Sequence, residues 1–185
     1  MGPEERELPP FLVAVLLTLS ACSESPVSNG SGNDQVAAPT GHTDIQKQNL
    51  ANFDDLDFRV YSGQKWDEFS KSHAPDILVH YPDGSTTTGL PAHLEKLKPQ
   101  FAFSPDTAIR EHPIRLADGN YTAVQGIMEG TFSKLLDLGN GKVVQPTGKK
   151  FRLPMLTVGR WENGVMKEEW LYWDNAAFMR QIGVS

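Results

Sequence analysis

The sequence predicts an α+β domain in which N-terminal helices pack against a curved antiparallel sheet to give a cone. Three observations lead to this fold class. Helical patterns are concentrated before residue 104, long strand-like stretches follow them, and turn signals separate these stretches. Helices followed by a run of strands are typical of helices packed on one sheet. The open end of such a cone would be a natural apolar site for a small molecule.

The predicted helices occupy the first part of this domain. Residues 44–61 form the first helix, with Asp44 as its cap and apolar residues at helical spacing, namely Leu50, Phe53, Leu56 and Val60. Residues 66–72 form a second, short helix. Residues 91–103 form a third helix, with Pro91 in its first turn.

Strands are predicted over the β-branched and aromatic residues 77–81 and over four longer stretches, namely residues 107–116, 121–136, 149–161 and 165–173. Glycine-containing turns separate the long stretches, at Asp118-Gly119-Asn120, Gly139-Asn140-Gly141 and Glu162-Asn163-Gly164. Asp174 then caps a short terminal helix that runs to about residue 181.

The chain of 185 residues has room for one domain and an N-terminal extension. Residues 1–21 are predicted to be a signal peptide, because the apolar run at residues 11–19 is shorter than the roughly 20 residues that span a bilayer. Residues 22–43 are rich in Ser, Gly, Asn and Pro, which predicts a flexible tether. The folded domain is therefore expected at residues 44–185.

Leu19-Ser20-Ala21-Cys22 resembles a bacterial lipobox, in which the cysteine is lipidated and becomes the new N-terminus. The resemblance implies a secreted protein that a lipid anchors to the membrane of the bacterial cell envelope. Ser23 in the next position implies sorting to the outer membrane, facing the periplasm. The residues before the apolar run depart from a basic signal, because they hold three glutamates and one arginine. The alternative is a buried N-terminal helix with an inert thiol at Cys22.

Composition argues against several kinds of site. The net charge is −6 and no run of Lys and Arg stands out, so nucleic acid is not an expected partner. No two histidines have the spacing of a common zinc motif, so no metal and no other cofactor is expected. His73 and His93 are expected on the surface. The expected partner is a small apolar organic ligand.

One face of the last predicted strand carries carboxylates among aromatic rings. Strand alternation places Glu168, Trp170, Tyr172 and Asp174 together on this face. Apolar neighbours raise a carboxyl pKa by desolvation, and an acid tuned toward neutrality can take and return protons. Asp174 is thus the leading candidate for a catalytic group, although Asp is also a preferred helix cap.

Several segments together resemble the SnoaL-like polyketide cyclases, or ester cyclases, of the nuclear transport factor 2-like superfamily. The segments are His80-Tyr81-Pro82 with Gly89, Pro146-Thr147-Gly148-Lys149-Lys150, Trp161-Glu162-Asn163-Gly164, residues 168–174 and Gln181-Ile182-Gly183. The resemblance covers about residues 50–183. It implies a cone-shaped α+β fold and an intramolecular aldol condensation that needs no cofactor or metal.

The resemblance also implies roles for individual residues. The acid/base aspartate of these cyclases falls at Asp174, and His80 or Tyr172 would polarise the carbonyl group. Trp170 and His112 are further candidates for the pocket wall. Many family members have a histidine in a Gly-Thr-His triplet where this chain has Gly130-Thr131-Phe132, so Phe132 would make the pocket drier.

Three functions remain open at this point. The first is a cyclase or isomerase that abstracts a proton next to a carbonyl group. The second is a non-catalytic lipoprotein that binds an apolar small molecule, which the expected envelope location and Phe132 favour. The third is a dimeric scaffold, because exposed sheet faces in this superfamily often pair into homodimers.

Overall fold

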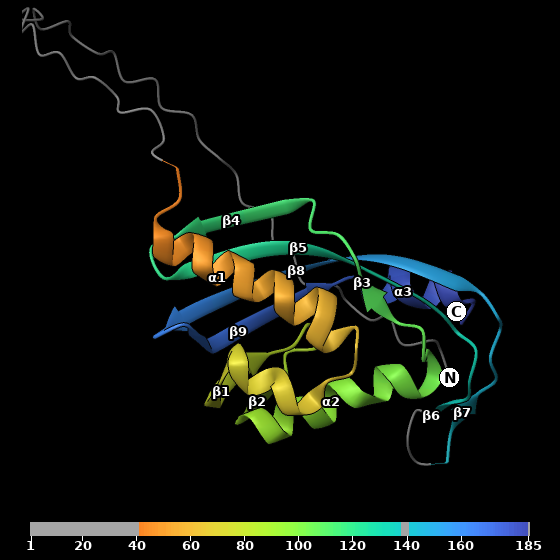
Figure 1. The fold of residues 1–185 in the computed structure, drawn as a ribbon. Coiled ribbons are helices and arrows are strands. Elements are labelled where there is room, and N and C mark those ends of the chain that lie inside the picture. The colour runs from red at the N-terminus through yellow and green to blue at the C-terminus, as the bar shows by residue number, and fades with distance from the viewer. Residues whose placement is uncertain (1–40, 138–140, 185) are drawn as a thin grey trace, which may run out of the picture. The chain divides into compact units, whose positions relative to one another are not determined.

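The computed structural model describes residues 41–137 and 141–184 and confirms the predicted α+β class. A long curved sheet lies behind the helices, which cover one of its faces (Figure 1). All described elements belong to one compact unit, Pro39–Ser185. Among the described residues, no helix is both long and apolar enough to cross a membrane. The predicted signal peptide and the lipidation site Cys22 lie outside the described residues and stay predictions.

The first helix is α1, Asp44–Asp55, and it continues directly into the π-helix η1, Leu56–Tyr61. Its N-cap is Thr43, whose hydroxyl accepts a hydrogen bond from the backbone N–H of Gln46 while the Gln46 side chain accepts one from Thr43. The prediction of Asp44 as the cap is therefore wrong by one residue, and the predicted end at residue 61 is confirmed. Single π-helical turns occur frequently at functional sites.

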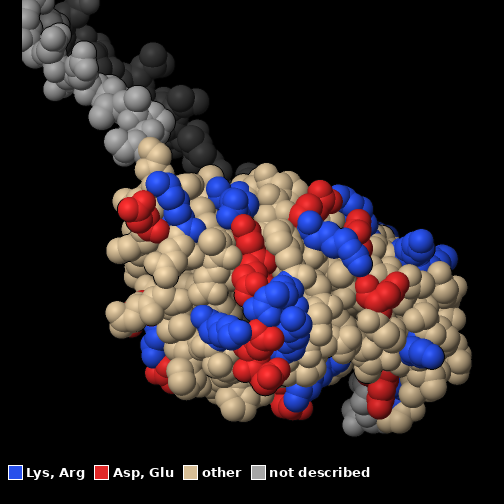
Figure 2. Space-filling view, in the orientation of Figure 1, with Lys and Arg blue, Asp and Glu red and all other residues tan. Residues whose placement is uncertain are grey.

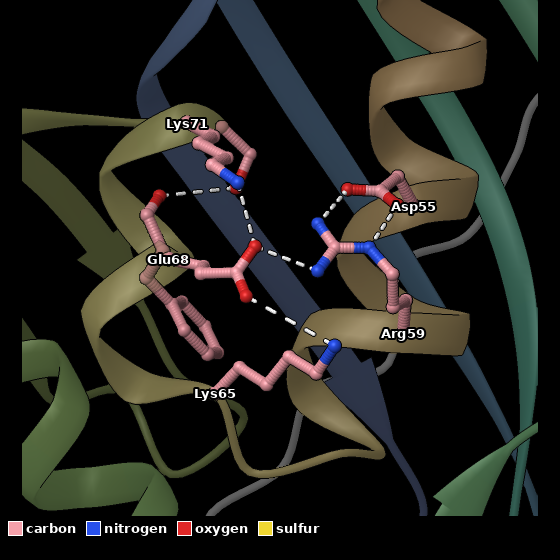
Figure 3. Close-up of polar contacts among 7 residues, drawn as sticks. Asp55, Arg59, Lys65, Glu68 and Lys71 are labelled. Atoms are coloured by element: carbon pink, nitrogen blue, oxygen red, sulfur yellow. Dashed lines mark hydrogen bonds and ion pairs between the residues drawn. The ribbon is translucent and has the colours of Figure 1, made fainter.

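Ion pairs hold η1 against the next helix, η2, Trp66–Lys71 (Figure 3). Arg59 lies between Asp55 and Glu68, with a nitrogen–oxygen distance of 2.6 Å to each carboxylate. Lys71 reaches the same Glu68 carboxylate at 2.6 Å. Hydrogen bonds from Lys71 and Arg59 lower the pKa of Glu68 to about 2. Figure 2 shows acidic and basic side chains side by side on the face of the molecule in view. The ion pairs of Arg59 link the π-helix to α1 and to η2.

A short hairpin and the second long helix follow. Strand β1, His73–His80, pairs with β2, Thr86–Thr88, and helix α2 covers Leu90–Phe103. The strand predicted at residues 77–81 and the helix predicted at residues 91–103 are both confirmed. The strand begins earlier than predicted, which brings His73 into the sheet.

The remaining strands are β3 (Ala108–Ile109), β4 (Ile114–Asp118), β5 (Tyr121–Thr131), β6 (Leu136–Asp137), β7 (Val143–Val144), β8 (Lys150–Glu162) and β9 (Val165–Trp173). The main sheet has seven strands in the order β2-β1-β9-β8-β5-β3, and β4 also pairs with β5. β1 and β9 pair in parallel, so the sheet is mostly but not wholly antiparallel. The predicted strand at residues 107–116 is divided into β3 and β4, and Pro113, which has no N–H to donate, lies in the break.

The last helix, α3, spans Asn175–Ile182, and Asp174 caps it as predicted. The Asp174 carboxylate accepts a hydrogen bond of 2.9 Å from the backbone N–H of Ala177. Gly183 ends the helix in the left-handed conformation that glycine favours, with φ 76°. The core lies between the helices and the inner face of the sheet, where the largest fully buried side chains include Phe53, Phe69, Ile77, Leu153 and Met166.

Candidate functional site

A cavity of about 230 Å³ lies between the helices and the inner face of the sheet. Most of its wall is apolar, with side chains that include Leu56, Phe69, Leu97, Ile109, Met128, Leu153, Met155, Leu171, Trp173 and Phe178. A few polar side chains also reach it, among them Asp57, Tyr61, His73, His93, Lys96, Gln100 and Glu169. An apolar wall with a few placed polar groups is typical of a small-molecule site.

Asp57 projects from η1 to the cavity wall, and a histidine holds its carboxylate. His112 Nε2 lies 2.9 Å from Asp57 Oδ2, and His112 Nδ1 lies 2.8 Å from Asp54 Oδ1. Arg115 Nη2 lies 2.6 Å from the other oxygen of Asp54. These four residues, which we call the acid–histidine relay, alternate acid and base from the cavity toward the surface, so that their charges compensate.

Burial shifts the pKa values within the relay. The side chain of His112 is 1% exposed and that of Asp57 is 14% exposed. Burial raises the pKa of the Asp57 carboxyl, and the hydrogen bond from His112 offsets this only in part. Burial alone would lower the pKa of His112, but its bonds to Asp57 and Asp54 outweigh burial and raise that pKa. A carboxyl group shifted in this direction can exchange protons with a bound ligand.

Tyr61 and Gly126 shape the cavity near Asp57. The closest polar partner of the Tyr61 hydroxyl is Met128 Sδ at 3.7 Å, which is a weak acceptor. Burial raises the pKa of Tyr61, so its phenol keeps a proton that it can donate to a ligand. A Cβ at Gly126 would lie 3.5 Å from Asp57 Oδ2 and 3.2 Å from Ile109 Cγ2. The lack of a side chain at Gly126 therefore leaves space beside the carboxylate.

A second group, His73 with His93 and Glu169, meets at another part of the same cavity, and we call it the buried triad. Glu169 Oε2 lies 3.5 Å from His93 Nε2 and 3.8 Å from His73 Nε2. The three side chains are 1%, 3% and 5% exposed for His73, His93 and Glu169. They come from β1, α2 and β9, so only the folded chain brings them together.

Each histidine of the triad is oriented through its Nδ1 atom. His73 Nδ1 lies 2.9 Å from Ser72 Oγ, and His93 Nδ1 lies 2.8 Å from the Tyr81 hydroxyl. Both Nε2 atoms therefore face Glu169. Among the described residues, His73 Nε2 and Glu169 Oε2 are the buried side-chain polar atoms that have no hydrogen-bond partner. Such atoms are rare in folded proteins and call for a physical explanation.

The triad also has shifted pKa values. Burial lowers the pKa of His93 to about 4, and the carboxylate of Glu169 opposes this shift only in part. Burial alone would raise the pKa of Glu169, but the two imidazoles that face its carboxylate outweigh burial and lower it. The site thus favours a neutral imidazole at position 93 beside an ionised carboxylate at position 169.

The face of β9 that was expected to line the apolar pocket lies on the outside of the sheet, where Tyr172 helps to line a shallow surface depression. Trp170 stacks on His80 with ring centroids 5.2 Å apart, and Tyr172 is 51% exposed. His80 Nε2 lies 3.0 Å from Glu168 on this same outer face. The alternate residues of β9 line the cavity instead, namely Glu169, Leu171 and Trp173. A shift of one residue exchanges the two faces of a strand, which is the physical reason for this correction.

The other predicted residues are also placed by the structure. The Asp174 side chain is 62% exposed and lines a shallow surface depression, whereas its chain neighbours Trp173 and Asn175 line the cavity. Its catalytic role stays a prediction. Phe132 is fully buried and packs against Phe103, with ring centroids 5.9 Å apart, so it belongs to the core. His112 does come close to the cavity, where it holds Asp57.

Sequence reasoning missed most of the polar residues of the cavity. The prediction that His73 and His93 are surface residues is wrong, because both side chains are buried. Asp57 was not singled out, although it lies four residues after Phe53 and three before Val60, on the apolar side of the predicted helix. A charged residue within that apolar side was the available signal.

Comparisons with known proteins place the fold. The family model for the SnoaL-like polyketide cyclases matches residues 58–182. The structure of a SnoaL-like protein from a Jannaschia species superposes with a TM-score of 0.68 at 19% identity, covering 79% of this chain and 99% of that one. Wild-type IdmH from Streptomyces antibioticus gives a TM-score of 0.64 at 23% identity, covering 74% and 99%. A search of curated proteins found no match.

Proposed function

Because this chain belongs to the SnoaL-like polyketide cyclase family, we propose that it catalyses acid/base chemistry on a small carbonyl compound. The reaction would be proton abstraction next to a carbonyl group, followed by ring closure or isomerisation. The observation that supports this most directly is the carboxylate of Asp57, buried in an apolar cavity and bound by His112. The IdmH and Jannaschia structures support the fold only.

Asp57 is the proposed base. Its carboxylate would take a proton from the carbon next to the carbonyl group and leave an enolate. In ring closure, the enolate carbon would form a bond to a second carbonyl carbon of the same molecule. Asp57 would then return its proton to the resulting alkoxide, so that atoms and charge balance without a co-reactant. A base with a raised pKa suits both transfers, because it is neither too weak to accept a proton nor too weak an acid to return it.

Tyr61 is the proposed hydrogen-bond donor to the enolate oxygen. It lines the same cavity and lies one turn after Asp57 on η1. Its present contact with the thioether of Met128 is weak, so a ligand oxygen can replace it without loss. A neutral donor directed at developing charge in an apolar site stabilises a transition state strongly.

The test uses 2-tetralone, a small apolar ketone, in D₂O, with NMR detection of exchange at its acidic carbon. Wild-type protein should accelerate exchange, and Asp57→Asn should lower the rate by about 10²–10⁴. The amide keeps the shape of the cavity, so binding of the ketone should persist and can be followed by ligand line broadening.

The same substitution at Asp174 compares the two assignments directly. Asp174→Asn that abolishes exchange, with Asp57→Asn unaffected, would contradict the role given to Asp57 and support the sequence-based prediction. A ketone that binds to wild-type protein without any exchange would favour the non-catalytic binding protein.

A further inference from the structure

The buried triad has the composition of a metal site. Two imidazole nitrogens and one carboxylate oxygen converge, with the ligand atoms all within 4.8 Å of one another. We propose that His73 and His93, through Nε2, and Glu169, through Oε2, bind a divalent transition-metal ion, with zinc as the reference case. This goes beyond the proposed acid/base function, which uses the relay and Tyr61, and beyond what the sequence predicted.

The distances from Glu169 to the two histidines fit a site that needs little adjustment, and all three ligand atoms lie within 4.8 Å of one another. Zinc binds imidazole nitrogen at about 2.0–2.1 Å and carboxylate oxygen at about 2.0–2.2 Å, so tetrahedral ligands lie about 3.4 Å apart. The Glu169 oxygen lies 3.5 Å from one imidazole nitrogen and 3.8 Å from the other. Both distances are too long for hydrogen bonds, and both come within a few tenths of an ångström of the spacing between zinc ligands.

Unpaired atoms argue against a purely structural role. His73 Nε2 and Glu169 Oε2 are buried, face each other and have no hydrogen-bond partner. A cluster built for hydrogen bonding would satisfy these atoms, because an unpaired buried polar group costs about 1–3 kcal/mol. A metal ion between the three side chains would satisfy both atoms at once and would compensate the charge of the carboxylate.

Each imidazole has the second contact that metal-bound histidines usually have. The Nδ1 atom of His73 lies beside Ser72 Oγ, and that of His93 lies beside the Tyr81 hydroxyl, at 2.9 and 2.8 Å. Such contacts fix the ring and leave Nε2 free to bind the ion. A donor set of two nitrogens and one oxygen suits zinc or ferrous iron, whereas calcium and magnesium prefer oxygen alone.

The open position of the ion would face the cavity. All three triad residues line it, so a fourth ligand could be water or an oxygen of the bound molecule. Sites with three protein ligands and one open position are typical of catalytic zinc. The chemical class of ligand that this predicts is a small apolar compound with a carbonyl or carboxylate oxygen.

The test measures metal binding by the full-length chain, independently of any activity. Purified protein is stripped with a chelator, dialysed, and titrated with Zn²⁺ against a chromogenic chelator and, separately, with Co²⁺ under visible spectroscopy. We expect one equivalent per chain and an intense four-coordinate cobalt spectrum. His93→Gln and Glu169→Gln should each lower zinc affinity at least 100-fold.

The matched control is His80→Gln. His80 of β1 pairs with Glu168 of β9, so it lies on the same two strands as His73 and Glu169 but on the outer face of the sheet. The zinc affinity of this variant should equal that of wild-type protein. The variants above could also lose zinc affinity by misfolding, so a further variant tests for a gain of signal. His93→Cys should add a thiolate-to-cobalt charge-transfer band that wild-type protein lacks. No bound metal in wild-type protein, equal affinity in the triad variants, or no new band in a folded His93→Cys protein would overturn the proposal.

Discussion

The cavity holds two groups of acids and histidines that differ in how completely their bonds are made. In the relay, both ring nitrogens of His112 have carboxylate partners, and Asp54 pairs in turn with Arg115. In the triad, His73 Nε2 and Glu169 Oε2 have no hydrogen-bond partner. A completed relay is suited to moving protons, whereas an incomplete cluster is suited to binding something else. The two groups therefore support two separate proposals.

The two groups also respond to pH in opposite directions. The pKa values of Asp57 and His112 are both raised, so the stability that the relay provides is greatest at low pH and is lost as pH rises through the folded-state pKa values. The pKa values of His93 and Glu169 are both lowered, so the stability from the triad is lost as pH falls. This difference in sign lets each group be examined without a substrate.

The largest effect on folding should come from breaking the relay. His112→Gln removes the cation between two carboxylates and leaves the charge of Asp57 buried without its partner. We expect the free energy of unfolding at pH 7 to fall by about 3–5 kcal/mol, because an uncompensated buried charge is costly. Urea denaturation followed by circular dichroism measures this loss. A change below about 1 kcal/mol would show that the relay is not a compensated ion group.

The next largest effect is a loss of stability at acidic pH that comes from the triad, and it is measured on metal-free protein. His93 faces Glu169 of β9, His73 of β1 and the Tyr81 hydroxyl. Its pKa is about 4 in the folded protein against an ordinary value of 6.5, so the unfolded chain binds a proton first as pH falls. Stability should therefore fall by about 3 kcal/mol between pH 6.5 and 4.

The His93→Gln variant tests the origin of that fall. It should lose most of the pH dependence in this window, although Glu169 adds a smaller loss of the same sign at the acidic end. Unfolding curves at several pH values, for both proteins in chelator, make the measurement. The same slope in both proteins would contradict a neutral, buried imidazole at position 93.

The fold was predictable because it depends on local patterns, such as apolar spacing and turn residues, that occur in most of its elements. The apolar spacing of residues 44–61 and the turn at Glu162-Asn163-Gly164 each agree with the final structure. The site was less predictable because it depends on which of the two faces of β9 is directed toward the cavity. Glu168 and Glu169 are adjacent, and only the packing of β9 against the helices decides which of them faces the cavity.

The triad could not be predicted from spacing. His73, His93 and Glu169 belong to three elements, and the parallel pairing of β1 with β9 is what brings the first and last together. No local motif encodes a contact between residues so far apart in the chain. The buried aspartate at position 57 was within reach, because it interrupts the apolar side of a predicted helix.

The smallest effect should come from the acid–histidine pair on the outer face of the same strands. His80 is 33% exposed and Glu168 is 23% exposed, and Arg160 also contacts Glu168 at 3.3 Å. His80→Gln should therefore lower the free energy of unfolding by less than about 1 kcal/mol, because water and Arg160 still compensate the carboxylate. Urea denaturation of His80→Gln and His112→Gln under the same conditions compares the loss of unfolding free energy for the same substitution at the two sites. A loss as large as that of His112→Gln would contradict the view that burial makes the relay more important for stability than the exposed pair.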